Sequence, residues 1–411
     1  MNPLPLVLAT LRRHRLTFAL FTVLVAVAVA LGVAISSTER ALRSGSARAA
    51  DKFDLVVAAP GSRNDVVFTA IYLKPGTVPL LEGAMVARAL AEPRAKFAAP
   101  LAFGDSHKGA PVVGTVAAFV DHLSGGLAQG RAFKSVNEAV VGANSTLKIG
   151  ETFRPQHGDG NAADADEDED AGHEHPIDIT VVGRMKPTGT PWDRAIAVPV
   201  EQVWSVHGLP YGHAPVAEGT AIPVGPPFEA AFVSGAPAVI LTPENVNAAY
   251  GLRNAYKTSA SMAFFPAEVL VEIYAVMGDV RALLATVAWS AQVLVAISIL
   301  AALAALFALN RRQYSVLRAL GAPPGFFMAG TWAYVALIIV AGTAIGMALG
   351  VGVAALLAAN VSRQTGVALS ASVGWPELQL ALAFVAAGLL LALVPAWLSS
   401  RGSPMAALTN A

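Results

Sequence analysis

The sequence has no cysteine and few charged residues. Asp, Glu, Lys and Arg make up 14% of its 411 residues and 55% are hydrophobic, whereas a typical soluble domain carries about 25% charged residues. Without cysteine, the chain has no disulfide, thiolate metal site or cysteine nucleophile. It also lacks the G-x-x-x-x-G-K-[ST] pattern of a phosphate-binding loop, so we expect no ATP site of that kind.

Charged residues are missing altogether from four long stretches, which are residues 16–38, 282–310, 319–362 and 378–400. Each is longer than the roughly 20 apolar residues that cross a bilayer core. The sequence therefore predicts a membrane protein with four transmembrane helices, at 16–38, within 266–309, at 326–358 and at 378–399. The first stretch shares a basic start with cleaved signal peptides, but its apolar run exceeds their usual length of about 7 to 15 residues, which favours a retained anchor.

Positive charge is distributed unevenly around these helices. Arginines without neighbouring acids lie before the first helix, between the second and third, and after the fourth; they are Arg12, Arg13, Arg15, Arg311, Arg312, Arg318 and Arg401. Residues 39–281 instead hold 20 Lys and Arg against 27 Asp and Glu. Because cytoplasmic loops are enriched in Lys and Arg, we expect both termini, residues 1–15 and 400–411, and the segment 310–322 to be cytoplasmic. The domain 39–265 and the loop 359–377 are then external.

The segment 39–265 has the pattern of an α+β domain inserted between the first two transmembrane helices. Short β-branched runs punctuated by Gly and Pro predict strands at 55–57, 111–116, 139–141, 177–182, 195–200 and 238–241. From residue 266 to 288, apolar residues recur at helical spacing without a proline break. This pattern predicts an amphipathic stalk that continues into the second transmembrane helix.

Residues 156–176 form an acidic insertion in this domain. From His157 to Glu174 there are eight Asp and Glu and no apolar residue larger than Ala, so the segment buries too little surface to fold and we expect it to be disordered. Imidazole and carboxylate groups suited to Zn²⁺ are present at His157, His173, Glu174 and His175. Their spacing matches no structured zinc motif, and the favoured interpretation is a solvated acidic linker.

Other polar groups in the domain have structural explanations as good as functional ones. Asp193 and Arg194 follow a Thr-Gly-Thr-Pro turn and either contact a substrate or stabilise the turn. His207 and His213 lie in a Gly- and Pro-rich segment beside Trp204. We interpret them as residues of a surface loop.

Glycines recur at four-residue spacing in the third predicted transmembrane helix, at Gly342, Gly346 and Gly350. Small residues at this spacing permit close contact between helices in lipid. Glycine is also common in transmembrane helices generally, so both interpretations stand.

Two motifs flank the last three predicted transmembrane helices. Residues 311–322, RRQYSVLRALGA, combine a basic pair with an LRALGA element, and residues 395–408 contain a Pro-Ala pair, a basic residue and a P-x-x-A-L turn. With the order of one helix, an external domain and three helices, these motifs resemble the MacB-like and FtsX-like permeases, or type VII ABC transporters. Residues 53–57, 61–62, 188–195 and 265–270 are similar to a bacterial branch of the same family.

The resemblance implies a non-catalytic permease subunit in a bacterial inner membrane, in contact with lipid and with no nucleic-acid partner. It implies a separate ABC ATPase dimer, which binds ATP and Mg²⁺, and a second permease chain, giving a homodimer. In such systems ATP hydrolysis moves the external domain, which is called mechanotransmission. The coupling helix at 310–322 would dock on the ATPase through Arg311, Arg312, Tyr314, Leu317, Arg318, Leu320 and Gly321. The same basic helix also fits an anchor to lipid headgroups.

Two other classes of function fit parts of the pattern. An ATPase-independent sensor or scaffold would use the external domain but would have no need of the LRALGA element. A membrane-anchored metal hydrolase would need a fixed three-ligand site, whereas we expect the histidine-containing insertion to be disordered.

Overall fold

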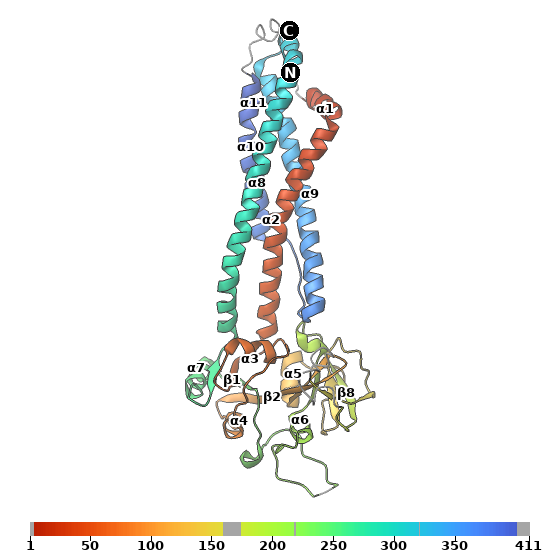
Figure 1. Cartoon of the computed structure of the whole chain (residues 1–411), viewed down its shortest axis with the longest axis vertical. Coiled ribbons are helices and arrows are strands. Elements are labelled where there is room, and N and C mark those ends of the chain that lie inside the picture. The colour runs from red at the N-terminus through yellow and green to blue at the C-terminus, as the bar shows by residue number, and fades with distance from the viewer. Residues whose placement is uncertain (1–3, 159–173, 218, 320, 401–411) are drawn as a thin grey trace. The chain divides into compact units, whose positions relative to one another are not determined.

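The structure is a computed structural model of the chain, and it describes residues 4–158, 174–217, 219–319 and 321–400 (Figure 1). The chain divides into two compact units. Unit 1 comprises Met1–Leu42, Val276–Asn360 and Leu369–Ala411. Unit 2 comprises Arg43–Ala275 and Val361–Ala368.

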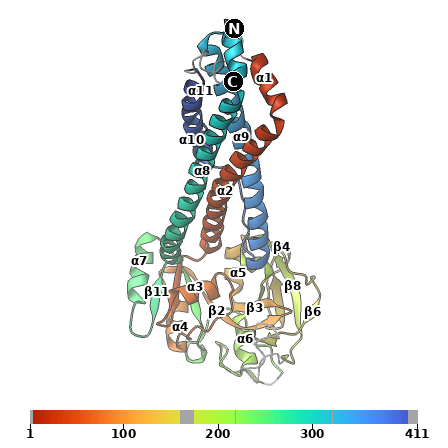
Figure 2. The same cartoon turned by 45° about the horizontal axis from the view of Figure 1, so that its top comes forward.

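Unit 1 is helical. Its residues belong to α1 (Leu4–Arg13), α2 (Arg15–Ala50), α8 (Pro266–Ala319), α9 (Pro324–Thr365), α10 (Trp375–Leu391) and α11 (Leu393–Ser400). The apolar core includes Val25, Val29 and Val33 of α2 together with Ile338 and Ile339 of α9. Figures 1 and 2 both show α2, α8 and α9 side by side in this unit.

Among the described residues, three helices are long and apolar enough to cross a membrane. They lie at Arg15–Ala50, Pro266–Ala301 and Gly325–Thr365, and their most apolar windows have mean hydropathies of 2.8, 2.1 and 2.2. The fourth predicted helix, at 378–399, is divided into the 17-residue α10 and the short α11. Because Pro395 has no N–H to donate to the carbonyl of Leu391, the regular hydrogen-bond pattern stops there.

The long helices differ from their predicted bounds. α8 is continuous from Pro266 to Ala319, so residues 310–319, expected as a separate coupling helix, form its C-terminal end. α9 runs to Thr365, past the expected end at residue 358. In both cases the helix continues because no proline or positive-φ glycine interrupts it; Gly321 and Gly366, with φ of 95° and 74°, follow the two ends.

Unit 2 is an α+β domain, which confirms the predicted class. Its strands are β1 (Leu55–Ala58), β2 (Ala95–His107), β3 (Ala110–Thr115), β4 (Leu127–Gly130), β5 (Glu138–Val141), β6 (Thr152–Phe153), β7 (Gln156–His157), β8 (Ile179–Met185), β9 (Ile196–Pro199), β10 (Ala238–Pro243) and β11 (Met262–Phe264). The sheet order is β11-β1-β10-β2-β3-β9-β5-β8-β4, with β6 beside β8 and β7 beside β2. Most neighbouring strands are antiparallel, but β3–β9 and β5–β8 are parallel.

Helices cover both faces of this sheet. They are α3 (Arg63–Ala70), α4 (Gly83–Leu90), α5 (Ala117–Ser124), α6 (Val200–Val206) and α7 (Val246–Ala255), with short 3₁₀ turns at Pro191–Arg194 and Ala230–Phe232. Successive strand residues point to opposite faces: Val57 packs in the cluster that contains α4 and α6, whereas Val56 packs with α3 and α5. The domain therefore has an α/β/α layering.

The ends of three long helices belong to unit 2. Ala49 and Ala50, at the end of α2, and Val269 and Leu270, at the start of α8, are buried in the cluster that contains α3 and α5. The end of α9 is also included, through Val361–Ala368. The hydrophobic core of unit 2 thus contains residues from the helices that contribute most of unit 1.

Candidate functional site

The predicted coupling residues lie at the end of α8. Residues 310–319 are helical, but side chains from 302 to 319 lie outside the described part of the structure, as does residue 320. Gly321 has a φ of 95°, a backbone conformation that favours glycine. The LRALGA element therefore contains the point where α8 ends.

The glycine ridge of α9 lies against α2 within unit 1. A Cβ placed on Gly342 would lie 2.9 Å from the carbonyl oxygen of Thr22, and one on Gly346 would lie 2.6 Å from that of Ala26. At Gly350 the corresponding distance, to the carbonyl oxygen of Ala30, is 2.8 Å. A Cβ cannot lie so close to a carbonyl oxygen. Only glycine at these three positions therefore allows the backbones of α2 and α9 to approach this closely.

A buried ion pair in unit 1 was not predicted from the sequence. Glu377, in the first turn of α10, has a fully buried side chain, and Arg40 of α2 donates a hydrogen bond to it at 2.8 Å. Ser36 Oγ and the backbone N–H of Gly374 donate to the same carboxylate, each also at 2.8 Å. Arg40 further donates to the carbonyl of Ser372. The pair joins α2 to the start of α10.

The Thr-Gly-Thr-Pro turn of unit 2 has a structural role. The Asp193 carboxylate accepts hydrogen bonds from the backbone N–H groups of Thr188, at 2.7 Å, and Gly189, at 2.8 Å. Arg194 donates to the carbonyl oxygen of Arg363, and Ala368 N–H donates to the carbonyl oxygen of Gly189. Asp193 thus stabilises the turn, and the turn contacts the last turn of α9 at Arg363 and, beyond the helix, Ala368.

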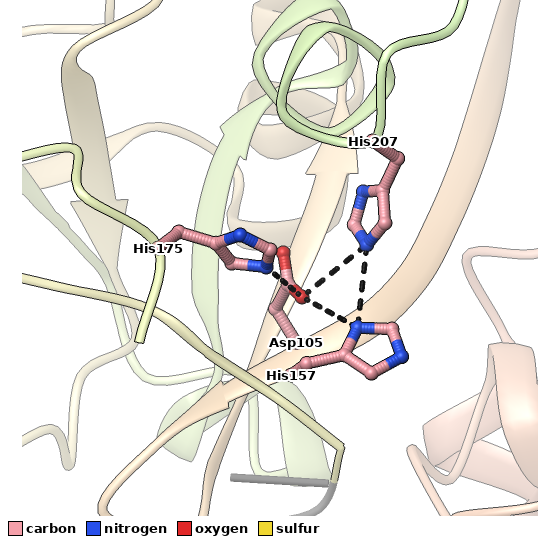
Figure 3. A group of neighbouring side chains, drawn as sticks. All are labelled: Asp105, His157, His175 and His207. Atoms are coloured by element: carbon pink, nitrogen blue, oxygen red, sulfur yellow. Dashed lines mark hydrogen bonds and ion pairs between the residues drawn. The ribbon is translucent and has the colours of Figure 1, made fainter. Parts of the chain in front are cut away.

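Four residues from separate elements of unit 2 converge to form a His–Asp cluster, which we define as Asp105, His157, His175 and His207 (Figure 3). Asp105 and His157 are direct partners in the antiparallel pairing of β2 with β7, so their side chains share one face. Glu174 pairs with Gln156, and His175 N–H donates to the carbonyl of Pro155. His207 follows the last residue of α6.

A β-bulge lies next to the cluster on β2. The pairing with β3 shifts between Ala102 and Asp105, which adds one residue to β2, and Gly104 has a φ of 145°. An added residue reverses the face to which the following side chains point. The bulge therefore directs Asp105 towards β7 and α6.

The ligand atoms of the cluster are close together. Asp105 Oδ1 lies 3.1 Å from His175 Nε2, 3.6 Å from His157 Nδ1 and 3.7 Å from His207 Nε2. His207 Nε2 and His157 Nδ1 are 3.3 Å apart. The Asp105 side chain is fully buried, whereas those of His157, His175 and His207 are 41%, 17% and 26% exposed. A buried carboxylate thus faces three rings that solvent can reach.

The cluster changes several interpretations drawn from the sequence. His157 and His175 are two of the Zn²⁺ ligands that the sequence offers, and the structure brings them together. Glu174 points elsewhere, with its Oε1 accepting a hydrogen bond from Gln156, and His173 lies outside the described residues, as do residues 159–172 of the acidic insertion. At the first end of the insertion Gln156 and His157 pair with β2 as β7, and at the second end Glu174 and His175 pair with Gln156 and Pro155. His207 was interpreted as a surface-loop residue and is instead a member of the cluster.

A second pair of ionisable residues lies near α6. Glu201 and His213 are both buried, with Glu201 Oε1 3.5 Å from His213 Nε2. Burial raises the pKa of the Glu201 carboxyl, although Gly225 N–H donates to it. Because Phe228 packs on the His213 ring at 5.5 Å, this pair is enclosed and less suited to binding a ligand than the His–Asp cluster.

Comparison with known proteins identifies the C-terminal part of the chain. Residues 285–404 match the family model described as FtsX-like permease C-terminal. No curated protein matches the chain.

Among solved structures, the chain is similar to the periplasmic region of MacB from Actinobacillus actinomycetemcomitans. The identity is 10% and the TM-score 0.31, over 56% of this chain and 95% of that chain. The extracellular domain of the noncanonic ABC-type transporter YknZ from Gram-positive bacteria gives 12% identity and a TM-score of 0.27, over 51% and 98%. At such TM-scores the two likenesses carry no functional inference.

The family match covers the segment that contains the RRQYSVLRALGA motif and the apolar helices α9 and α10. The motif, these two helices and the family match thus all lie within residues 285–404. Over residues 285–404, the chain is therefore similar to the C-terminal domain of the FtsX-like permeases.

Proposed function

We propose that the chain is the permease subunit of an ABC transporter that works with a separate ABC ATPase dimer. The observation that carries the proposal is the match of residues 285–404 to the FtsX-like permease C-terminal family. The ATPase binds ATP and Mg²⁺ and docks at the end of α8, where Arg311, Arg312 and Arg318 accompany Leu317 and Leu320. A second copy of the chain completes the complex.

In this proposal the chain crosses a bacterial inner membrane four times, with both termini in the cytoplasm. The fourth crossing uses α10 together with α11. Arginines at both ends of the chain and after α8 support this topology, because cytoplasmic segments near membrane helices are enriched in Lys and Arg. Unit 2 then lies on the external side.

Mechanotransmission is the proposed mode of action. α2 and α8 are continuous helices of 36 and 54 residues, and their ends are buried in the core of unit 2 at Ala49, Ala50, Val269 and Leu270. A displacement of either helix therefore acts on close-packed side chains, which transmit strain because protein interiors have low compressibility. The substrate is handled at unit 2 for export or extraction, and it need not pass between the helices.

The coupling residues provide the test. Leu317 and Leu320 have the spacing by which an apolar helix face enters a partner groove. Changing both to Asp places charge without a partner in that groove, at a cost of several kcal/mol. Ser315→Asp adds charge to the same segment at a polar position and serves as the matched control.

In the experiment, the wild-type chain and each variant are purified separately from the native membrane. Each preparation is then assayed for a co-purifying P-loop ATPase and for ATP hydrolysis. We expect the ATPase to accompany the wild type and Ser315→Asp but not the double variant, with membrane insertion unchanged. Retention of the ATPase by the double variant would place coupling elsewhere. Absence of an ATPase from the wild-type complex would favour the alternative of a sensor or scaffold protein.

A further inference from the structure

We propose that the His–Asp cluster of unit 2 is a binding site for a divalent transition-metal ion of the Zn²⁺ type. The cluster lies in the α+β domain, outside the family-matched residues 285–404. The proposal goes beyond the permease function and does not depend on an ATPase partner.

The donor atoms suit such an ion. Three imidazole nitrogens and one carboxylate oxygen lie within 4.8 Å of one another, and nitrogen ligands of this kind favour Zn²⁺ and its neighbours in the first transition row. Ca²⁺ and Mg²⁺ prefer sites made of oxygen ligands. The chemistry of the site therefore selects for a borderline-soft cation.

The spacing of the donor atoms matches a four-coordinate site. With bonds of about 2.0–2.1 Å, ligand atoms around a tetrahedral Zn²⁺ lie about 3.3 Å from one another. Four of the atom pairs are separated by 3.1, 3.3, 3.6 and 3.7 Å. The side chain of His157 is 41% exposed and has room to move, so its 3.6 Å separation from Asp105 can contract around an ion.

Hydrogen bonds orient the ring of His207 for ligation. Its Nδ1 lies 2.8 Å from the carbonyl oxygen of Val203, and since a carbonyl only accepts, the proton is on Nδ1. In the neutral ring, which is the form that ligates a metal, Nε2 then presents a lone pair towards Asp105 and His157. A ligating histidine commonly donates its other N–H to a carbonyl, which fixes the tautomer.

Hydrogen bonding leaves Asp105 incompletely satisfied. Of the three imidazole nitrogens around its Oδ1, only that of His175 is within hydrogen-bond distance. Its Oδ2 is buried and has no hydrogen-bond partner among the described residues. A buried carboxylate normally has its oxygens paired or bound to a cation, and a metal ion in the cluster would supply the missing positive charge.

A bound ion would also connect parts of unit 2 that the chain leaves separate. His157 and His175 lie at the two ends of the acidic insertion, while Asp105 belongs to β2 and His207 follows α6. The ion would therefore hold both ends of the insertion against the sheet and the helix.

The test is a Zn²⁺ titration of the full chain in detergent, purified with a tag that contains no histidine and monitored by competition with a chromophoric chelator. Asp105→Asn and His207→Ala change residues of the cluster alone, and His173→Ala changes the insertion alone. His122→Ala, elsewhere in unit 2, is the control for loss of a histidine. Co²⁺ provides a second readout, because tetrahedral coordination gives it strong visible absorption bands.

We expect one Zn²⁺ per wild-type chain and a tetrahedral Co²⁺ spectrum, both kept by His173→Ala and His122→Ala. Asp105→Asn and His207→Ala should weaken binding by more than 100-fold, above the 10–100-fold that loss of an outer-shell partner typically costs. If His207→Ala does not fold, Asp105→Asn decides, since it preserves the shape of the side chain. Absence of saturable binding, or binding lost in His173→Ala but kept in Asp105→Asn, would overturn the proposal.

Discussion

The ion pair between Arg40 and Glu377 should be one of the more costly interactions of unit 1 to remove. The Glu377 carboxylate accepts hydrogen bonds from Arg40, Ser36 and Gly374, each at 2.8 Å, and its side chain is fully buried. Glu377→Ala leaves all three donors without this acceptor. Breaking a buried ion pair costs about 3–5 kcal/mol, and because the Arg40 side chain keeps 32% exposure and can be hydrated, we expect about 3 kcal/mol.

The assay is unfolding of the detergent-solubilised chain, with Glu272→Ala as the control. Glu272 pairs with Arg63 at 3.0 Å, but the two side chains are 58% and 41% exposed, so its loss should cost at most about 1 kcal/mol. A double-mutant cycle of Glu377→Gln with Arg40→Met should give a coupling of about 1–3 kcal/mol. A free energy of unfolding for Glu377→Ala within about 0.5 kcal/mol of the wild type, or a cycle with no coupling, would refute the reasoning.

Two further predictions concern pH and helix contact. The side-chain hydrogen bond from Arg131 lowers the pKa of Glu138 from 4.5 to about 2, so the contribution of this ion pair to stability is complete above pH 4.5 and is lost as the pH falls towards 2. Because Arg131 is half exposed, Glu138→Gln should remove only about 1 kcal/mol of this acid-dependent stability. Identical pH profiles of unfolding for the wild type and the variant would contradict this. Gly346→Ala should destabilise unit 1 by about 1–3 kcal/mol through contact with α2. In thermal unfolding the control Gly352→Ala, which meets no atom within 4 Å, should be neutral or stabilising, and equal effects of the two substitutions would argue against the contact.

The local sequence pattern predicted the elements whose residues all lie in one kind of environment, such as a strand buried on both faces or a long apolar helix. The runs at 139–141 and 238–241 lie in β5 and β10 because β-branched residues suit a sheet buried on both faces. The charge-free stretches correspond to α2, α8 and α9. The break after α10 was missed because the stretch was judged by its lack of charge, although Pro395 carried the signal.

Residues brought together by strand register could not be predicted in this way. Asp105 and His157 are neighbours only because β2 pairs with β7 in one register, and the bulge at Gly104 that orients Asp105 has no clear pattern in the sequence. His207 lies next to them because α6 ends at that point of the sheet. Arg40 and Glu377 are 337 positions apart, and nothing in the sequence around either residue indicates that the two form an ion pair. The composition of the acidic insertion suggested disorder for its whole length, but its ends gain order from the strand beside them.

The chain segment 361–368 has a practical consequence for any attempt to study the external domain as a soluble fragment. Excision at the obvious borders, residues 43 and 275, would omit Val361–Ala368 and so remove the partners of Gly189 and Arg194. The turn that Asp193 stabilises would then be uncovered on one side. A faithful fragment has to be bipartite, with the 361–368 peptide supplied in trans or joined through a designed linker.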